Sequence, residues 1–270
     1  MLLKDKVAIV TGAASGIGAG TSIRMAEEGA AVIVADINFP GAQNIARQIV
    51  EAGGRAEPVE NDISDEAGVK AMMEFAIEKF GSITTIMNNA TPSVMLMDND
   101  HDLLNLDSEM WDRAMAVALK GTMLCCKHVI PHMVRAGGGS IVNISSLAGR
   151  LGMHNLMTYQ AAKAGIQALT RAIATRHGKE GVRCNAILPG FIETPAFAHM
   201  PPLARQTFMR HTMCTRGGRP DDIAYLAIFL SSDRAGYING VEIPVDGGYS
   251  CHEPATADFM AMQAEAEAPA

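Results

Sequence analysis

The chain has 270 residues, of which 48% are hydrophobic and 19% are charged, a composition that is typical of a globular protein and excludes a disordered one. Its net charge of −7, without a long basic run, excludes a nucleic-acid-binding surface and a polyanionic partner. No apolar stretch approaches the roughly 18 residues that cross a bilayer, and Lys4 and Lys6 interrupt the N-terminal apolar residues, so we expect neither a membrane span nor a signal peptide.

The cysteines and histidines indicate a reduced protein without a metal. The five cysteines have no repeated Cys-x-x-Cys spacing, which predicts neither a disulfide framework nor a zinc site. We therefore expect free thiols and a cytoplasmic location. The eight histidines form no His-Glu-x-x-His pattern, so no catalytic metal is expected.

The first predicted elements form a βαβ unit. The apolar run 6–10 predicts a buried parallel strand, which leads into Gly12, Gly16 and Gly18 and then into a helical pattern. Residues 31–36 predict a second buried strand. Glycines at these positions let a pyrophosphate approach the backbone amides at the start of the helix. An ordinary strand–turn–helix is the alternative.

Asp36 ends the second strand and distinguishes between two cofactors. A carboxylate at this place hydrogen-bonds the adenosine ribose hydroxyls of NAD and repels the 2′-phosphate of NADP. Neither the glycine loop nor residues 37–39 contains a lysine or arginine that could pair with that phosphate. The unit therefore predicts NAD as the cofactor.

The rest of the chain continues to alternate strands and helices. The predicted elements are a helix over 41–52, a strand ending near 60, a helix over 66–80, a strand over 83–87, a long helical region over 108–135 that is bent near Pro131, a strand over 140–144, a helix that carries Tyr159 and Lys163, a strand over 182–187, a helix over 220–231 and a strand over 241–245. This alternation predicts an α/β fold, a single-domain Rossmann-type doubly wound parallel sheet with helices on both faces.

We assign residues 1–251 to this NAD-binding catalytic domain, with 190–217 as a small substrate lid. Residues 252–270 are alanine-rich and acidic and are predicted to form a C-terminal tail. Folding over a neighbouring subunit is the alternative for this tail.

Ser146, Tyr159 and Lys163 are the candidate catalytic residues. Tyr159 and Lys163 are four residues apart and share one face of a helix. An ammonium beside a phenol favours the phenolate, which predicts a tyrosine pKa lowered from about 10 toward the range of a general acid/base. A solvated helix face is the alternative for the pair alone, but the cofactor-binding unit upstream favours catalysis.

Taken together, these motifs resemble the classical short-chain dehydrogenase/reductase family. The matching segments are Thr11-Gly12-x3-Gly16-Ile17-Gly18, Asn88-Asn89-Ala90, Ser146, Tyr159-x3-Lys163 and Pro189-Gly190, and the similarity covers residues 4–250. The resemblance implies that Tyr159 is the general acid/base and that Lys163 holds the nicotinamide ribose and lowers the tyrosine pKa. It implies that Ser146, rather than the competing Ser145, binds the substrate oxygen.

The resemblance also implies a set of cofactor-binding residues around the glycine loop and the strand ends. These residues are Gly12, Ser15, Gly16, Ile17, Gly18, Asp36, Asp62, Ile63, Asn89, Ala90, Tyr159, Lys163, Pro189, Gly190, Ile192 and Thr194.

Two residues depart from the family pattern. Thr91 follows Asn89-Ala90 where the family has glycine, so we expect a local backbone adjustment. Ala118 stands where the family has the asparagine that holds a water of the proton relay. A cofactor-binding sensor or scaffold with weak or no dehydrogenase activity is therefore an alternative to an active enzyme. Epimerisation or dehalogenation on the same fold is a third hypothesis, which the intact tyrosine and lysine disfavour.

The substrate is expected to be a hydrophobic or cyclic secondary alcohol or ketone. Ser146, Met153, Tyr159 and Phe191 are the predicted substrate contacts, and His154 is a further candidate for a polar contact. Other apolar residues of the pocket-forming segments are Leu147, Leu151, Met157, Phe197, Met200 and Met209, for which core or interface packing is the alternative.

Two further expectations concern surfaces. The segment 95–107 contains Asp98, Asp100, His101, Asp102 and Asp107, and we interpret it as a solvated loop at the mouth of the pocket rather than a metal site. The resemblance implies a homotetramer assembled through the long helices 108–135 and 157–177.

Overall fold

The structure is a computed structural model that describes residues 1–198 and 200–267. Within that part of the chain, seven parallel strands form one sheet in the order β3-β2-β1-β4-β5-β6-β7. The strands are β1 (Val7–Thr11), β2 (Ala31–Asp36), β3 (Arg55–Glu60), β4 (Thr85–Asn88), β5 (Gly139–Ile144), β6 (Val182–Pro189) and β7 (Glu242–Val245). The order reverses between β1 and β4, so the sheet is doubly wound as predicted.

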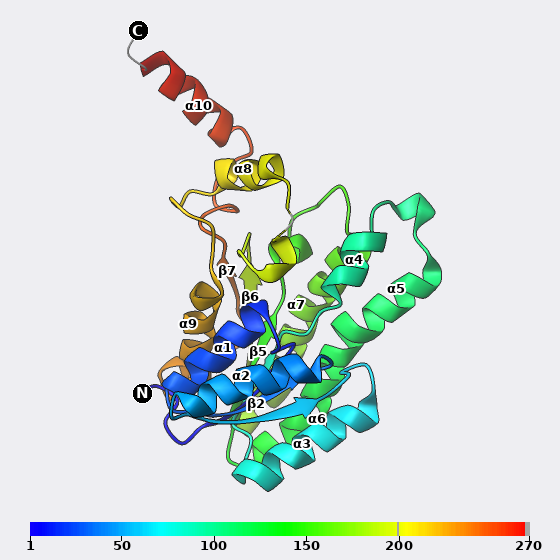
Figure 1. Cartoon of the computed structure of the whole chain (residues 1–270), viewed down its shortest axis with the longest axis vertical. Coiled ribbons are helices and arrows are strands. Elements are labelled where there is room, and N and C mark those ends of the chain that lie inside the picture. Colours follow the sequence, from blue (N-terminus) through cyan, green and yellow to red (C-terminus); the bar gives the residue numbers. More distant parts are fainter. Residues whose placement is uncertain (199, 268–270) are drawn as a thin grey trace.

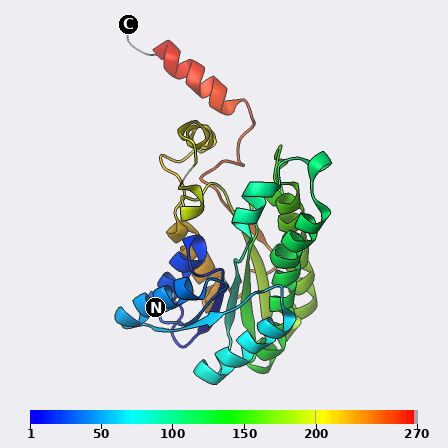
Figure 2. The same cartoon turned by 45° about the vertical axis from the view of Figure 1, so that its right-hand side comes forward.

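Helices cover both faces of the sheet (Figures 1 and 2). They are α1 (Gly16–Glu27), α2 (Phe39–Glu51), α3 (Glu66–Phe80), α4 (Ser93–Asn99), α5 (Ser108–Met115), α6 (Thr122–Arg135), α7 (Met157–His177), α8 (Pro202–His211), α9 (Pro220–Ser231) and α10 (Thr256–Glu267). A π-helical segment, Ala116–Gly121, joins α5 to α6, and short 3-10 turns lie at Leu103–Asn105, Leu147–Gly149, Gly178–Glu180, Pro195–Phe197 and Asp233–Ala235.

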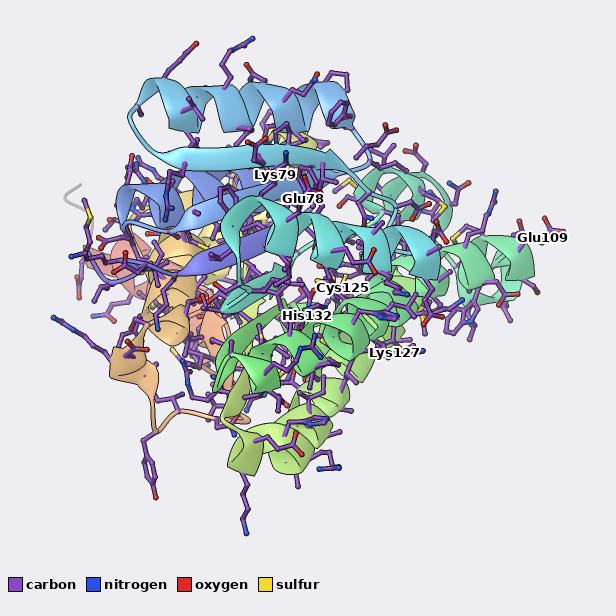
Figure 3. The ribbon with its side chains drawn as sticks, turned by 90° about the horizontal axis from the view of Figure 1, so that it is seen from below. Glu78, Lys79, Glu109, Cys125, Lys127 and His132 are labelled. Atoms are coloured by element: carbon purple, nitrogen blue, oxygen red, sulfur yellow. The ribbon has the colours of Figure 1, made fainter. Side chains whose placement is uncertain are left out.

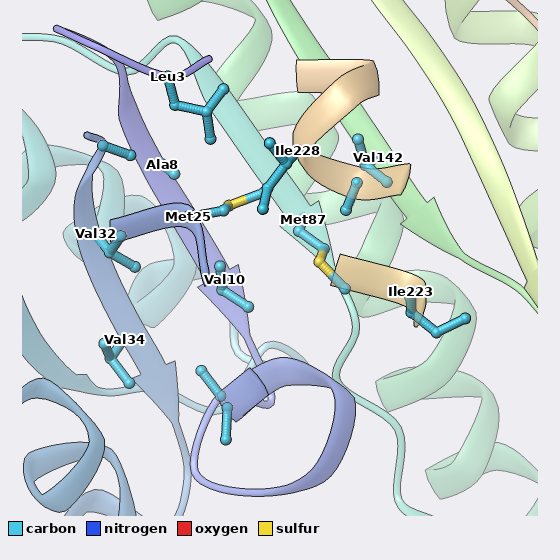
Figure 4. Close-up of a cluster of buried hydrophobic side chains, with 14 of the residues drawn as sticks. Leu3, Ala8, Val10, Met25, Val32, Val34, Met87, Val142, Ile223 and Ile228 are labelled. Carbon is cyan, nitrogen blue, oxygen red and sulfur yellow. The ribbon is translucent and has the colours of Figure 1, made fainter. Parts of the chain in front are cut away.

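The central strands are mostly apolar because each face of the sheet packs on its own hydrophobic core, whereas the edge strand β3 carries charged residues. Along β1, Ala8 and Val10 contribute to one core, which α1, α2 and α9 cover. Ile9, which points to the opposite face, belongs to the core under α3 and α6. Figure 4 shows the first of these cores, where Met25 of α1 and Ile228 of α9 meet the strand residues. This two-sided burial confirms the predicted fold class.

The second core is closed by α3 and α6, which Figure 3 shows from below. Cys125 of α6 is fully buried there, and burial raises its thiol pKa well above the ordinary value. At the surface, Lys127 Nζ lies 2.6 Å from Glu66 Oε1 at the start of α3. Hydrogen bonds from Lys127 and His128 lower the pKa of Glu66 to about 2, so this contact joins the two helices over most of the pH range.

The long helical region over 108–135 is present, but its irregularity was predicted at the wrong residue. α6 continues through Pro131, which lies on its exposed face, where water can bind the carbonyl that proline leaves without a donor. The distortion occurs instead in the π-helical segment, which contains the buried Ala118. Segments of π-helix often mark functional sites.

The predicted tail contains a helix. In Figures 1 and 2, α10 extends away from the sheet beyond α8, and an ion pair between Arg210 and Asp258 connects these two helices. Residues 268–270 of the predicted tail and residue 199 of the predicted lid lie outside the described residues. Among the helices that the structure describes, none has both the length and the apolar character needed to cross a membrane.

Candidate active site

The predicted site residues converge at the carboxyl ends of the parallel strands. The glycine loop follows β1, Asp36 ends β2, and Asn89 comes directly after β4. Ser146 follows β5 and Gly190 follows β6. Parallel strands present their carboxyl ends at one edge, and a reversal of strand order, here between β1 and β4, is where such sheets form a ligand-binding crevice.

The glycine loop packs so closely on the segment after β4 that side chains would not fit. A Cβ atom on Gly12 would lie 2.7 Å from Ala90 Cα, and one on Gly18 would lie 2.1 Å from Gly12 O. Gly12 also has a φ of +64°, which disfavours other residues. Asn89 Nδ2 fixes the contact by donating to Thr11 O at 3.1 Å and Gly12 O at 3.0 Å.

The start of α1 is open to an anion. Ser15 occupies the N-cap position with extended backbone, and its side chain makes no capping hydrogen bond. The amides of the first helical turn, including Ile17, have no partner within the helix. Asp36 lies beside this loop, where Oδ2 accepts from Ala14 N and Oδ1 accepts from Asn38 N, each at 2.8 Å. These residues fit a dinucleotide whose pyrophosphate meets the helix start and whose ribose meets the carboxylate.

Asp62 and Ile63 follow β3 but differ in burial. Asp62 is exposed, and its Oδ1 accepts from Ser64 N at 2.9 Å. The Ile63 side chain is only 4% exposed and packs where a Cβ on Gly121 would meet it at 2.7 Å. The isoleucine side chain therefore belongs to the second core.

The residues after β6 close the crevice from the other side. Pro189 is buried, and a Cβ atom on Gly190 would lie 2.8 Å from Asp246 Cα. Ile192 is 3% exposed and pairs with Gly218 in an isolated bridge. Thr194 comes next and reaches the glycine loop, since a Cβ on Gly16 would touch its side chain at 3.4 Å.

The two adjacent serines have different tasks. Ser145 is 1% exposed, donates to Lys163 O at 2.9 Å and accepts from Gln167 Nε2 at 3.1 Å, so it ties the end of β5 to α7. Ser146 is half-buried, and its Oγ accepts from Ala148 N at 3.1 Å. Because the Ser146 side chain also contacts the Tyr159 phenol, it is the serine that faces the crevice.

Tyr159 and Lys163 lie one helical turn apart on α7, as the spacing predicts. Lys163 Nζ is 5.5 Å from the centre of the Tyr159 ring. Burial raises the pKa of Tyr159, and the hydrogen bond with Ser146 lowers it only in part. The prediction that the lysine lowers the tyrosine pKa is therefore wrong, because burial has the larger effect and the lysine directs its hydrogen bonds elsewhere.

Those hydrogen bonds go to Ile144 O at 2.9 Å and to Thr91 Oγ1 at 3.0 Å. Lys163 is 3% exposed, and burial lowers its pKa to about 8. The sequence pattern identified Thr91 only as an unusual residue in place of glycine. Its contact with Lys163 could not be read from the sequence, because it joins residues that are far apart in the chain.

Asp100 is a functional candidate that the sequence interpretation missed. It was placed in a solvated loop, but it is fully buried. Its Oδ1 accepts from Thr158 N at 3.2 Å and Thr158 Oγ1 at 3.3 Å, and its Oδ2 accepts from Tyr159 N at 3.0 Å. Its backbone oxygen accepts from Leu156 N at 2.7 Å. A carboxylate from the segment after α4 therefore caps the helix that carries Tyr159.

One sequence signal could have indicated this cap. Leu156 occupies the N-cap position of α7 with φ +60°, and no side chain of its own can cap the helix. A long helix that begins with an apolar residue needs acceptors from elsewhere in the fold.

The other acids of this segment cap local turns. Asp102 accepts from Asn105 Nδ2 at 2.6 Å, and Asp107 accepts from Glu109 N at 3.0 Å at the start of α5. Asp98 and His101 are exposed. Within the residues that the structure describes, no group of three or more histidine, cysteine or acidic side chains is placed to hold a metal.

The predicted substrate residues fall into two groups. Phe191 is half-buried and stacks on Phe208 of α8, with ring centres 5.0 Å apart, and meets Phe197 edge-on at 5.6 Å. Met153 is 36% exposed on the loop before α7, where its amide donates to Gln160 Oε1 at 2.9 Å. His154 is exposed on the same loop.

Known proteins resemble this chain over nearly its whole length. A family model described as Enoyl-(Acyl carrier protein) reductase matches residues 12–250. The cis-4-hydroxycyclohexanecarboxylate dehydrogenase of Sinomonas cyclohexanicum is 42% identical over 246 residues, which cover 91% of this chain and 97% of that protein.

Two solved structures share the fold. Levodione reductase superposes with a TM-score of 0.87 at 32% identity, covering 93% of this chain and 100% of that one. A 7α-hydroxysteroid dehydrogenase complexed with NADH and 7-oxo glycochenodeoxycholic acid also gives a TM-score of 0.87, at 34% identity, covering 91% of this chain and 94% of that one.

The buried cap at Asp100 predicts a specific loss of stability. Asp100→Ala leaves the amides of Thr158 and Tyr159 without an acceptor and should lower the free energy of unfolding by about 2 kcal/mol, measured by urea titration. Asp98→Ala removes an exposed acid two residues earlier and should change it by less than about 0.5 kcal/mol. Equal losses in the two variants would contradict the role of the cap.

Proposed function

This chain belongs to the classical short-chain dehydrogenase/reductase family, and on this premise we propose that it is an NAD-dependent oxidoreductase that interconverts a secondary alcohol and a ketone. The observation that carries the proposal is the meeting of Tyr159 and Lys163 on one face of α7 with Ser146 at the end of β5. This group lies at the same sheet edge as the glycine loop.

Tyr159 is the proposed general acid/base. In alcohol oxidation its phenolate takes the proton of the substrate hydroxyl, and in ketone reduction the phenol returns it. The Ser146 hydroxyl donates to the substrate oxygen and stabilises the charge that develops on it. Lys163, whose Nζ lies 5.5 Å from the centre of the tyrosine ring, is the proposed partner of the nicotinamide ribose.

NAD is the proposed cofactor, and when bound its nicotinamide accepts or donates the hydride. Gly12, Gly16 and Gly18 allow the loop to pack closely before α1, whose N-terminal amides are the proposed site of its pyrophosphate, and Asp36 is the proposed partner of the adenosine ribose. The carboxylate would repel the extra phosphate of NADP. The other residues that we propose to line this site are Ser15, Ile17, Asp62, Ile63, Asn89, Ala90, Tyr159, Lys163, Pro189, Gly190, Ile192 and Thr194.

A hydrophobic, cyclic substrate is supported by the relatives and by the residues around the site. One relative is named for a hydroxylated cyclohexane ring, and one structural relative binds an oxidised steroid acid. In this chain, Phe191 and Met153 are the proposed apolar contacts beside Ser146 and Tyr159.

The domain assignment follows from the same site. We propose residues 1–251 as the catalytic domain and 190–217 as the substrate lid, because Phe191 stacks on Phe208 of α8. Residues 252–270 are the proposed C-terminal tail. A cytoplasmic location is proposed on the ground that all five cysteines are free thiols.

A homotetramer is the proposed assembly. Met115, Leu119, Met123 and Leu169 line an apolar groove where the π-helical segment meets α5, α6 and α7. Burying such a groove against a second copy would remove apolar surface from water. Sedimentation equilibrium is expected to give four times the 28.6 kDa chain mass, and a stable monomer would contradict the proposal.

A substrate screen tests the proposed activity. Secondary alcohols from small aliphatic to cyclic and steroidal are offered with NAD or NADP, and NADH formation is followed by absorbance. We expect turnover of cyclic alcohols with NAD, and a loss of about 100-fold or more in Tyr159→Phe because the general base is removed. Tyr237→Phe, which makes the same change on a fully exposed side chain, should keep wild-type activity.

Three outcomes would contradict parts of the proposal. Equal turnover with NADP would contradict the role of Asp36, and turnover of small polar polyols alone would contradict the apolar pocket. NADH binding without turnover of any alcohol would favour the alternative function, a cofactor-binding sensor or scaffold. Ala118 is the observation behind that alternative, since it is buried and has no polar side chain.

A further inference from the structure

The Lys163 ammonium is almost fully enclosed by protein. Its side chain is 3% exposed, and its hydrogen-bond acceptors among the described residues are Ile144 O and Thr91 Oγ1. The first is a backbone carbonyl, which accepts hydrogen bonds but has no proton to give. Thr91 therefore supplies the hydroxyl in the ammonium's hydrogen-bonding shell.

Thr91 connects this buried charge with the crevice. It is half-buried and follows Asn89 and Ala90 directly, on the segment that packs against the glycine loop. Its hydroxyl accepts from Lys163 Nζ at 3.0 Å and donates to Asn89 O at 3.5 Å. A hydroxyl can accept one hydrogen bond while it donates another, so Thr91 can hold the ammonium and bind the backbone of its own segment at the same time.

Ala118 cannot supply a polar side-chain contact for the Lys163 ammonium. It is 1% exposed, its side chain has no polar atom, and its carbonyl accepts from Thr122 Oγ1 at 2.9 Å. The polar side-chain contact of Lys163 thus comes from the end of β4 and not from the π-helical segment.

We propose that Thr91 is a positioning residue that acts through Lys163, holding the ammonium beside Tyr159. The proposal rests on the proposed oxidoreductase function and names a residue of that site to which the family motif gives no role. Threonine in place of the family's glycine then has a functional role, in addition to the local backbone adjustment that the sequence predicts.

Substitution of Thr91 by valine, which has the same shape without the hydroxyl, tests this role. Thr91→Val should lower kcat by about tenfold or more, because the ammonium loses one of its two acceptors and with it its position beside Tyr159. Thr91→Ser restores a hydroxyl and should recover the wild-type kcat. Thr21→Val is the matched control, since Thr21 is buried in α1 and its hydroxyl has no hydrogen-bond partner among the described residues.

A second readout needs no turnover. NMR titration of isotope-labelled lysine in the cofactor-free protein, with Lys163→Met for assignment, gives the Lys163 pKa. Tyr159 of the same helix is the titratable side chain that faces it. Loss of the Thr91 acceptor disfavours the ammonium, so Thr91→Val should lower this pKa and Thr91→Ser should leave it near the wild-type value.

The two readouts separate this proposal from the proposed function. Wild-type turnover with an unchanged kcat in Thr91→Val would overturn the positioning role and leave the oxidoreductase intact. An unchanged Lys163 pKa in Thr91→Val would overturn the contact itself. A wild-type protein without turnover whose Lys163 pKa still falls in Thr91→Val would contradict the oxidoreductase function and support the positioning contact.

Discussion

The structure of the site depends on a buried ammonium at the edge of a parallel sheet. A charge that is 3% exposed is stable only where acceptors surround it, and Lys163 finds them in Ile144 O and Thr91 Oγ1. Both acceptors lie at strand ends, so α7 must lie against the sheet at this point. Ser145 reinforces that position by donating to the backbone of Lys163. The contacts that hold Lys163 in position therefore also hold Tyr159 in position on α7, with Ser146 beside the tyrosine.

The segment after β4 holds α7 at two points. Thr91 binds Lys163, and Asp100 caps the amides of Thr158 and Tyr159 at the start of the helix. The helical turn that carries the proposed acid/base lies between these contacts. The left-handed backbone of Leu156, with φ +60°, is maintained by the hydrogen bond to Asp100 O. The segment after β4 thus determines both where α7 begins and how the Lys163 ammonium is held.

Local patterns in the sequence predicted the fold and the residues that the structure brings to the carboxyl ends of the strands. The strand, glycine loop and helix around Gly12 to Gly18 can be recognised from residues that are close together in the sequence. The same is true of the four-residue spacing of Tyr159 and Lys163. The contacts of Asp100 and Thr91 join residues that are far apart in the chain, so no local pattern reveals them. The raised pKa of Tyr159 depends on burial and on where Lys163 directs its hydrogen bonds, and both are properties of the folded chain.

The central claim is that the residues around Tyr159 support direct transfer of a hydride between the substrate carbon and the cofactor. Label transfer tests it most directly: a cyclic secondary alcohol deuterated at the carbinol carbon is turned over with NAD, and the NADH formed is analysed by mass spectrometry. The account predicts one deuterium in each NADH molecule formed. NADH without deuterium, or with hydrogen taken from the solvent, would contradict direct hydride transfer at this site.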